Sequence, residues 1–397
     1  NLDLYKSISG PDVTFAPIIN YKAVDEYTVI FELDEPWSAI SYYLSSTYFP
    51  ICDVDAYNES GNVWQACIGT GPYMLTEMVE GVSWKLEAFQ KYWDTPAEIE
   101  TIEVYRFADD SSRFNSFLAG AIDDIDTGLS QVQIQTLQLS GTEYTYGEVP
   151  LTNVYSMWMN TSRDVFSDVR VRQAVSMLIN REEVDIAMFG QGMYKSVDCP
   201  WSDNVSGYVS GTVYDYDPDK GLDLLKQAGV EPSDLSFSIL TVSSSGVMQI
   251  GAENIQAQLS QYGINVTIDG LAFFSCISSM FAGQFDAVFF NVDAYSADPV
   301  LCYTHPLLTG TFNTARVCDG MPELFAQFED LLGKAANVTD KNEQRELLEQ
   351  CTQLTYENAL VVPCGRTIMH FATVKGFEPS RSPDDGQTNF YYWKIAD

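Results

Sequence analysis

The stretch from Leu151 to Val184 constrains the fold of this 397-residue chain more than any other. It begins with an apolar and aromatic run of strand length that includes Tyr155 and Trp158, and that stops at Asn160-Thr161, a pair suited to a turn. Asp168 then occupies the position expected of a helix N-cap, ahead of apolar residues spaced along one helical face. A strand that leads straight into an amphipathic helix is typical of a chain that leaves one folded body and enters another.

Length and charge narrow the class of protein. A chain of 397 residues, 46% of them apolar, is too long for one ordinary core and predicts two or three domains. The 21 basic and 55 acidic residues give a net charge of −34, which repels phosphate backbones, so we expect no nucleic-acid partner. The sequence has no apolar run of about eighteen residues and no signal peptide, so we expect no membrane span within it.

The eight cysteines and two histidines limit metal and redox chemistry. No CxxC pair or histidine-containing cluster has the spacing of metal ligands, so we expect neither a metal site nor another cofactor. Two pairs, Cys52 with Cys67 and Cys302 with Cys318, lie in loop-rich segments and can form short disulfides in an oxidising compartment. Buried free thiols explain the same residues equally well.

The first part of the chain shows strand-like runs and one helical run. Lys22–Leu33 is predicted as a strand whose pairing partners lie elsewhere. Three more strands are predicted at Tyr73–Met78, Ser83–Phe89 and Ile102–Phe107. A helix at Ser111–Leu118 then leads into Gly120–Asp123, which predicts a strand–helix–strand unit with a parallel strand pair.

The second part of the chain alternates strands and helices more regularly. The predicted β–α–β–α–β elements are Leu235–Val242, Val247–Tyr262, Ile264–Ile268, Phe273–Ala282 and Ala287–Val292. Two helices at Leu324–Ala336 and Lys341–Tyr356 and a strand at Ala359–Pro363 follow. Because ligands of open α/β sheets bind beyond the carboxyl ends of the strands, we expect the loop Asp293–Pro299 to line a ligand site.

A search for catalytic motifs finds none of the common ones. The sequence lacks GxSxG, HExxH, GxxxxGK[ST] and GxGxxG, so we predict no catalytic residue and no enzyme. Paired carboxylates are expected by chance among 55 acidic residues, and they leave a secreted carbohydrate-active hydrolase with an aromatic cleft as the alternative. Tyr155, Trp158 and Tyr295 are placed where two lobes should meet, and each can stack on a ligand or pack in a core.

Six short motifs follow one another in a set order along the chain. They are Gly69–Tyr73 (GTGPY), Tyr92-Trp93, Ala119–Asp123 (AGAID), Asn160-Thr161 with Phe166–Ala174 (FSDVRVRQA), Asp215–Pro218 (DYDP), and Gly283–Asp286 (GQFD) running to Asp298-Pro299. The ordered set resembles the family 5 extracellular solute-binding proteins of ABC transporters, which include oligopeptide-, dipeptide- and nickel-binding proteins. The DVRVRQA element and the preceding Asn-Thr pair are the most specific part of the resemblance.

The resemblance implies a two-lobed, periplasmic-binding-protein-like α/β fold (type II, cluster C) with hinge strands near residues 160 and 365. It implies part of an extra subdomain at residues 1–66, a first lobe at 67–160 plus 366–397, and a second lobe at 161–365, without the family's N-terminal segment. Such a monomer captures a peptide or other small solute and delivers it to ABC permease subunits, in the periplasm or at the cell surface. A lipid anchor attached upstream is then its link to the membrane, and a sensor or adhesion module with the same fold is a further interpretation.

Carrying the family's ligand residues over to this chain exposes two differences. Peptide-binding members place an aspartate, which pairs with the peptide's α-amino group, where this chain has Tyr295. The basic residues that some members use for the peptide carboxylate fall on Gln249 and Ile250. Leaving both charges of a zwitterion desolvated and unpaired costs on the order of several kcal/mol. Either Asp293 or Asp298 substitutes from a shifted position, or the ligand is uncharged or differently charged rather than a free dipeptide.

Overall fold

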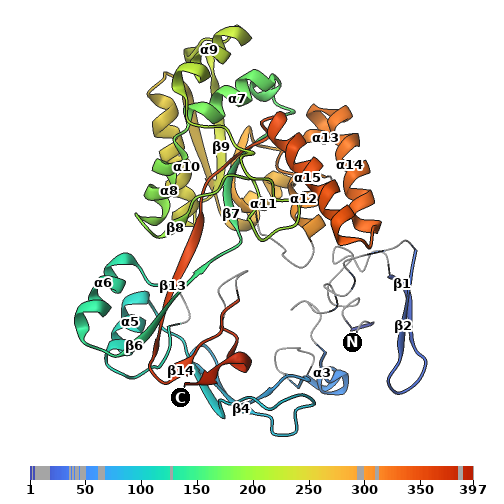
Figure 1. The fold of residues 1–397 in the computed structure, drawn as a ribbon, viewed down its shortest axis with the longest axis vertical. Coiled ribbons are helices and arrows are strands. Elements are labelled where there is room, and N and C mark those ends of the chain that lie inside the picture. The colour runs from blue at the N-terminus through green and yellow to red at the C-terminus, as the bar shows by residue number, and fades with distance from the viewer. Residues whose placement is uncertain are drawn as a thin grey trace. The chain divides into compact units, whose positions relative to one another are not determined.

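The computed structural model describes residues 1, 3–4, 18–34, 37, 40, 44, 51–60, 68–125, 128–292, 299–308, 313–382 and 388–396. The chain divides into two compact units, which are unit 1 (Asn1–Val149 and Met369–Asp397) and unit 2 (Pro150–Ile368). The strands β6 (Tyr144–Pro150) and β13 (Arg366–Val374) carry the chain from one unit to the other (Figure 1). The domain boundaries expected at residues 66, 160 and 366 stay predictions.

Unit 2 contains a five-stranded sheet in the order β10-β9-β11-β7-β12. Its strands are β10 (Asn265–Leu271), β9 (Ser236–Val242), β11 (Ala287–Val292), β7 (Val154–Met159) and β12 (Val361–Pro363). β9 pairs in parallel with both β10 and β11, whereas β7 runs antiparallel to both β11 and β12. The β–α–β–α–β order predicted from the sequence is therefore confirmed.

The helices α10 (Gly246–Ser260) and α11 (Phe273–Phe281) connect the three parallel strands. The chain passes from β9 outward to β10 and then back across β9 to β11. Because parallel crossovers are right-handed, the two helices cover opposite faces of the sheet, as Figure 1 shows. The buried strands and both helices contribute to one large core.

The stretch Leu151–Val184 forms β7 and then α7 (Val169–Leu178), with Asp168 as its N-cap, as predicted. At the end of β7, the Asn160 side-chain amide donates to the Phe285 carbonyl at 2.7 Å. The Thr161 hydroxyl donates to the Ala315 carbonyl at 3.0 Å. Asn160 and Thr161 therefore attach the end of the strand to two distant segments.

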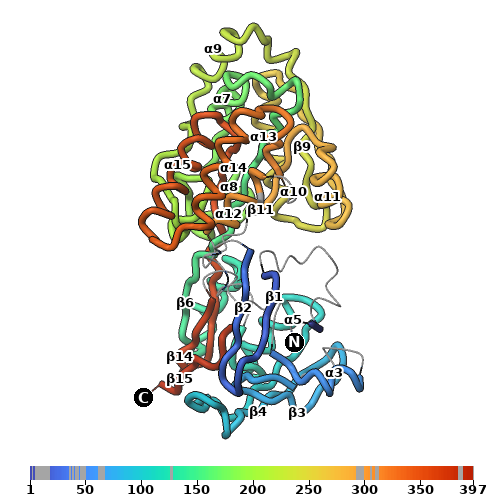
Figure 2. The backbone as a smooth tube through the Cα atoms, turned by 90° about the vertical axis from the view of Figure 1, so that its right-hand side faces the viewer, coloured from blue at the N-terminus to red at the C-terminus, as the bar shows by residue number. Residues whose placement is uncertain are grey.

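The rest of unit 2 consists of helices and one short strand. They are α8 (Arg181–Phe189), β8 (Tyr194–Lys195), α9 (Pro218–Ala228), α12 (Pro299–Leu307), α13 (Val317–Gly320), α14 (Pro322–Asn337) and α15 (Lys341–Glu357). α14 and α15 pack side by side, as Figures 1 and 2 show. Cys318 in α13 carries a free thiol, so the disulfide with Cys302 that the sequence allowed is absent.

Unit 1 contains an antiparallel sheet of β3 (Tyr73–Val79), β4 (Ser83–Ala88) and β5 (Thr101–Tyr105). α5 (Asp110–Leu118), α6 (Gln131–Ser140) and β13 build a separate small core. The parallel pair expected between the strand at 102–107 and residues 120–123 is wrong. Asp124 instead forms an isolated antiparallel bridge to Thr373 of β13.

The start of unit 1 differs from the expectation of one long strand at Lys22–Leu33. β1 (Ile18–Ala23) and β2 (Val29–Leu33) form an antiparallel hairpin, and the Val24 N–H donates to the Thr28 carbonyl across its turn. Short elements complete the unit, namely α3 (Val54–Ser60), β14 (Phe377–Glu378) and β15 (Lys394–Ile395). None of the described helices is both long and apolar enough to cross a membrane.

Candidate ligand-binding site

The carboxyl ends of β9, β10 and β11 lie at one edge of the sheet in unit 2, because these strands are parallel. β7 runs the other way and therefore begins at the same edge. In the register of β7 with β11, Tyr155 lies opposite Asn291 near this edge, whereas Trp158 lies opposite Val288 in the middle of the sheet. The carboxyl edge is where ligands of open α/β sheets bind.

Gln249 lies in the first turn of α10, which begins at the same edge after β9. Its side-chain nitrogen donates to Glu253 Oε1 at 2.8 Å, and a carboxylate only accepts, so this contact fixes the orientation of the amide. The Gln249 Oε1 atom is buried and has no hydrogen-bond partner within the described part of the chain. It lies 3.2 Å from where a Cβ on Gly270, at the end of β10, would stand. The edge therefore carries a spare hydrogen-bond acceptor.

Asp185 of α8 also belongs to this edge, and the sequence analysis missed it. The Gly365 N–H donates to Asp185 Oδ1 at 2.5 Å, and the Gly365 carbonyl accepts from the Tyr155 N–H at 3.3 Å. Burial raises the pKa of the Asp185 carboxyl to about 7, although the Gly365 N–H and the Arg181 charge act in the opposite direction. A Cβ on Gly365 would stand 2.8 Å from the Asp185 carboxyl carbon, so this approach requires glycine.

Three aromatic rings surround this part of the edge. The Tyr155 ring meets Phe189 edge-on with the centroids 5.4 Å apart, and Phe189 stacks on Tyr194 at 6.5 Å. Burial raises the pKa of the Tyr194 hydroxyl, with further effects from Glu182 and Asp185. The phenol of Tyr155 is therefore one part of an aromatic cluster next to a buried carboxyl group.

The other predicted ligand residues have different environments. Trp158 is fully buried in the core of unit 2, where its ring meets Trp201 edge-on at 6.5 Å. Its indole nitrogen has no hydrogen-bond partner among the described residues. Asp293, Tyr295 and Asp298 lie outside the described residues. The structure thus brings Tyr155 and Gln249 to one edge of the sheet and places Trp158 inside it, and the ligand roles of all six residues stay predictions.

The described residues show no group of three or more His, Cys, Asp or Glu side chains that is arranged to hold a metal ion. What the edge offers is hydrogen bonding, aromatic surface and the first turn of a helix. The N-terminus of α10 carries the positive end of the helix dipole, and its first turn has no acidic residue. This arrangement suits the binding of a solute.

Residues 4–313 match the model of the bacterial extracellular solute-binding proteins, family 5 Middle. The chain belongs to this family. The dipeptide-binding protein of Escherichia coli (strain K12) is 25% identical over 388 residues, which cover 93% of this chain and 69% of that protein. The dipeptide-binding protein of Pseudomonas aeruginosa is 23% identical over 389 residues, covering 91% of this chain and 70% of that protein.

Solved structures share the fold. NikA from Brucella suis in complex with Fe(III)-EDTA has a TM-score of 0.82 at 21% identity, and the match covers 96% of this chain and 79% of NikA. A putative peptide-binding protein, AppA from Clostridium difficile, has a TM-score of 0.85 at 18% identity, covering 100% and 83% of the two chains. The family resemblance and the two-lobed α/β fold expected from the sequence are confirmed.

Family membership establishes the general function. The chain is an extracytoplasmic solute-binding receptor of an ABC import system, as the motif order implied. Proteins of this family are binding receptors rather than enzymes, and the comparisons give no support to the hydrolase alternative.

Proposed function

We propose that this receptor captures an oligopeptide or another small solute at the carboxyl edge of the sheet in unit 2. The solute presents a neutral hydrogen-bond donor, rather than a carboxylate, to Gln249. The relatives named as dipeptide- and peptide-binding proteins support a peptide-like solute. The NikA complex with Fe(III)-EDTA supports the use of the same fold for other small molecules.

The observation that carries this proposal is the unpartnered oxygen of Gln249. A buried amide oxygen gains a hydrogen bond from an N–H or O–H group of a ligand but repels a carboxylate. This chain has Tyr295 at the position where an aspartate would pair with a free α-amino group, and this difference supports the same conclusion. Both differences favour an uncharged or differently charged solute over a free dipeptide, unless Asp293 or Asp298 supplies the missing charge.

The remaining parts of the proposal concern the whole protein. Residues 1–66 belong to an extra subdomain, residues 67–160 with 366–397 form the first lobe, and residues 161–365 form the second. The lobes close on the solute by bending at the chain crossings near residues 160 and 365, and the loaded monomer delivers it to permease subunits. An anchoring lipid attached upstream holds the receptor at the membrane.

A thermal-shift screen tests the solute class, because a ligand that binds the native state raises the melting temperature. The screen compares free dipeptides, peptides blocked at both ends, amino acids, sugars and metal chelates. We expect blocked peptides or other neutral solutes to stabilise the protein more than free dipeptides do. A free dipeptide that binds best, and that loses affinity when its carboxylate is blocked, would overturn the proposed solute class.

A pair of variants tests the site. Gln249→Leu removes the acceptor and should weaken the binding of the best solute by about 1–3 kcal/mol, measured by calorimetry. Gln261→Leu, at the C-cap of the same helix, is the matched control and should leave the affinity unchanged. Equal affinities for the two variants would rule out Gln249 as a ligand contact. Small-angle scattering with and without the solute tests closure, which should make the particle more compact.

A further inference from the structure

The backbone at the start of β7 is held by the segment that follows β12. The Cys364 N–H donates to the Tyr155 carbonyl at 2.7 Å, and the Tyr155 N–H donates to the Gly365 carbonyl at 3.3 Å. The Gly365 N–H in turn donates to Asp185 Oδ1 at 2.5 Å. A chain of hydrogen bonds therefore leads from the carboxyl group of Asp185, through one glycine residue, to the backbone of Tyr155 at the carboxyl edge of the sheet.

Helix α8 reaches Tyr155 by a second route. Phe189 lies one turn after Asp185 on α8, and its ring meets the Tyr155 ring edge-on. Residues four positions apart lie on the same face of a helix, so both contacts come from one face of α8. Asp185 acts on the backbone of Tyr155, and Phe189 contacts its ring. Movement of the segment around Gly365 away from α8 would therefore displace Tyr155.

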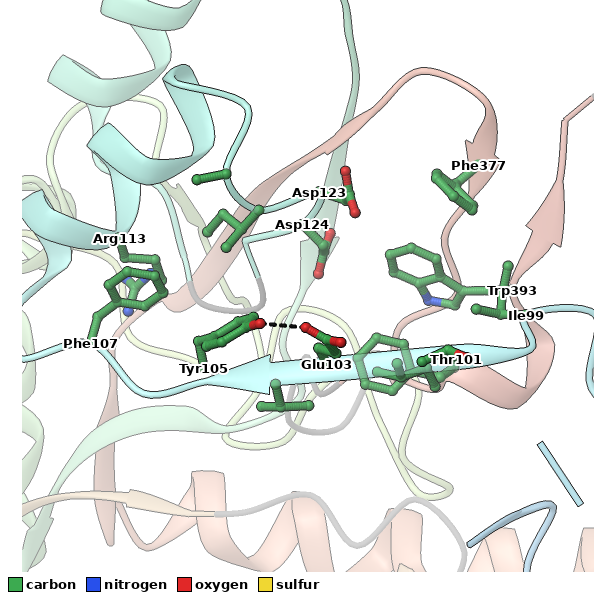
Figure 3. Close-up of a pocket in the computed structure, with 15 residues that line it drawn as sticks. Ile99, Thr101, Glu103, Tyr105, Phe107, Arg113, Asp123, Asp124, Phe377 and Trp393 are labelled. Carbon is green, nitrogen blue, oxygen red and sulfur yellow. Dashed lines mark hydrogen bonds between the residues drawn. The ribbon is translucent and has the colours of Figure 1, made fainter. Parts of the chain in front are cut away.

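The carboxyl group of Asp185 is buried without a side-chain donor. Asp185 is 2% exposed, and within the described part of the chain its one hydrogen-bond partner is the backbone N–H of Gly365. The carboxylate of Glu103 differs, because it is exposed in the cavity beside β5 of unit 1 and accepts from the Tyr105 hydroxyl, as Figure 3 shows. A buried carboxyl group without such a donor is most stable in its neutral form.

The titratable and charged groups that act on Asp185 come from α8, β8 and the segment after β12. Desolvation is the main cause that raises the pKa of the Asp185 carboxyl to about 7. On α8, the Arg181 charge lowers this pKa and the Glu182 charge raises it. Burial raises the pKa of the Tyr194 hydroxyl and of the Cys364 thiol, so neither group competes with Asp185 for titration near pH 7.

Ionisation of Asp185 favours the opening of this segment. When residues 364–366 move away from α8, water reaches the carboxyl group, whose pKa then returns to about 4. The opened form therefore loses its proton at a lower pH than the seated form. The opening equilibrium increases as the pH rises from about 4 to about 7, and it is constant at higher pH. Below this range the neutral carboxyl group still accepts from the Gly365 N–H and keeps the segment seated.

We propose that Asp185 is a positioning residue of the solute site, whose neutral carboxyl group keeps Tyr155 in place and whose ionisation loosens the carboxyl edge of the sheet. Asp185 acts through Gly365 and does not touch the solute. Because the solute binds the seated edge, the solute and the proton stabilise the same state of the receptor. This last step rests on the proposed function, whereas the link from Asp185 to Tyr155 does not.

Residue-resolved hydrogen exchange of the solute-free protein at pH 5, 6 and 7 tests the link. After correction for the intrinsic rate, exchange of the Tyr155 and Gly365 amides should quicken about fivefold or more per pH unit. In Asp185→Asn, whose amide can still accept from Gly365, the corrected rates should not change with pH. The Ile239 amide in the middle of β9 is the reference for global unfolding and should exchange more slowly.

Two results of this exchange experiment would overturn the proposal. Tyr155 and Gly365 amides that exchange no faster than the Ile239 amide would show that the segment opens only when unit 2 unfolds. The same pH dependence in the wild type and in Asp185→Asn would show that another group is responsible.

Nuclear magnetic resonance adds a test that a purely structural role would not pass. The Gly365 and Tyr155 amide resonances should titrate with the same midpoint as the carboxyl carbon of Asp185. Glu182→Gln removes a charge that raises the pKa of Asp185, so the shared midpoint should move to lower pH. Glu183→Gln on the same helix is the matched control and should leave it unchanged. A Tyr155 resonance that does not follow the Asp185 titration would overturn the proposal.

A variant and a peptide extend the test. Gly365→Ala places a Cβ 2.8 Å from the Asp185 carboxyl carbon, so exchange at Tyr155 should quicken at every pH. If this variant does not fold, the midpoint shift in Glu182→Gln still decides. The peptide acetyl-trialanine-amide should slow exchange at Tyr155 by stabilising the seated edge. Unchanged exchange with this peptide, beside a normal pH dependence without it, would count against the proposed solute class and not against the link.

Discussion

Each unit buries an arginine side chain, but the two are held in different ways. Arg172 in unit 2 has no exposed surface, and it donates to the carbonyl oxygens of Phe166 at 2.6 Å, Ser167 at 3.1 Å and Asn358 at 2.9 Å. These contacts join the first helix after the crossover to the end of α15. Desolvation lowers the pKa of Arg172 to about 10, against the opposite effects of Asp168 and Tyr214, so the guanidinium stays charged at neutral pH.

Arg381 in unit 1 is held by a carboxylate. Its side chain is 1% exposed, and one of its nitrogens lies 2.6 Å from both oxygens of Asp124. The guanidinium also lies over the Phe371 ring, 4.5 Å from its centroid.

The two arginines differ in the groups that their removal would leave without a partner. Removing Arg172 leaves neutral carbonyl groups without a donor, whereas removing Arg381 leaves a mostly buried carboxylate without its counter-charge. An unpaired buried charge is more costly than unsatisfied carbonyls. The most specific sequence motif, which contains Arg172, therefore stabilises the fold.

The strongest test of the comparison is Arg381→Met. It should destabilise unit 1 by about 3–5 kcal/mol, because Asp124 is 12% exposed and loses its ion pair. Urea unfolding followed by hydrogen exchange at Phe114 and Phe117, in the core of unit 1, measures the loss. Combining Arg381→Met with Asp124→Asn removes the stranded charge and should recover most of the stability. A loss below about 1 kcal/mol for the single variant would contradict the account.

The second test measures how the stability of unit 2 changes with pH as the Asp185 carboxyl ionises. Its pKa of about 7 in the folded protein lies above the ordinary value of 3.8, so its contribution to stability is complete below about pH 4 and is lost as pH rises through about 7. The free energy of unfolding of the wild type should therefore fall by about 3–4 kcal/mol between pH 4 and pH 7, relative to that of Asp185→Asn. The amide of Asp185→Asn can still accept the hydrogen bond from the Gly365 N–H.

Urea unfolding at half-unit steps of pH measures this effect. Glu183→Gln is the matched control on the same helix, and it should leave the slope between pH 4 and pH 7 nearly unchanged. If the free energies of unfolding of the wild type and of Asp185→Asn change with pH in parallel, the Asp185 carboxyl ionises in the folded protein as it does in the unfolded chain.

The third test compares two arginines of the DVRVRQA motif, the buried Arg172 and the more exposed Arg170. Arg172→Met should destabilise unit 2 by about 2–3 kcal/mol, because buried carbonyl groups lose their donors. Arg170→Met is the matched control, since the Arg170 side chain is 44% exposed and pairs with Asp168 at the surface, and it should cost less than about 1 kcal/mol. Similar losses for the two variants would disprove the structural role assigned to Arg172.

The smallest effect concerns two buried tryptophans of unit 2. The Trp201 indole donates to the Cys302 carbonyl at 3.1 Å, whereas the Trp158 indole has no partner among the described residues. Trp201→Phe should therefore cost about 1 kcal/mol more than Trp158→Phe in chemical unfolding. Equal losses of stability in the two variants would show that the hydrogen bond from Trp201 to Cys302 does not contribute to stability. Weaker solute binding in Trp158→Phe would support the ligand contact predicted from the sequence.

The sequence predicted unit 2 well because its elements have clear periodicity. The strand at Ala287–Val292 has the predicted bounds, and Gly229 ends α9 in the left-handed conformation with φ of 75°. The apolar runs and their stop signals are local properties of the chain, so they can be recognised without the fold. Family motifs then supplied the two-lobed architecture.

What the sequence missed depends on contacts between distant residues. Asp185 lies beside Val184 and one turn before Met188 on the buried face of α8, which marks it as a carboxylate on an apolar face. Its partner Gly365 is 180 residues away, so the raised pKa could not be derived from the local pattern. The parallel pair expected of β5 failed for the same reason, because alternation identifies a strand without identifying its neighbour.

The central claim is that the solute binds at the carboxyl edge of the sheet in unit 2. Residue-resolved hydrogen exchange, with and without the best solute from the thermal-shift screen, tests it most directly. The account predicts slower exchange in the first turn of α10 around Gln249, at Tyr155, and at the carboxyl ends of β9 and β10. The Gln249→Leu variant should show less protection at the same solute concentration. Protection confined to other segments, with the Gln249 and Tyr155 amides unchanged, would contradict the placement of the solute at the carboxyl edge of unit 2.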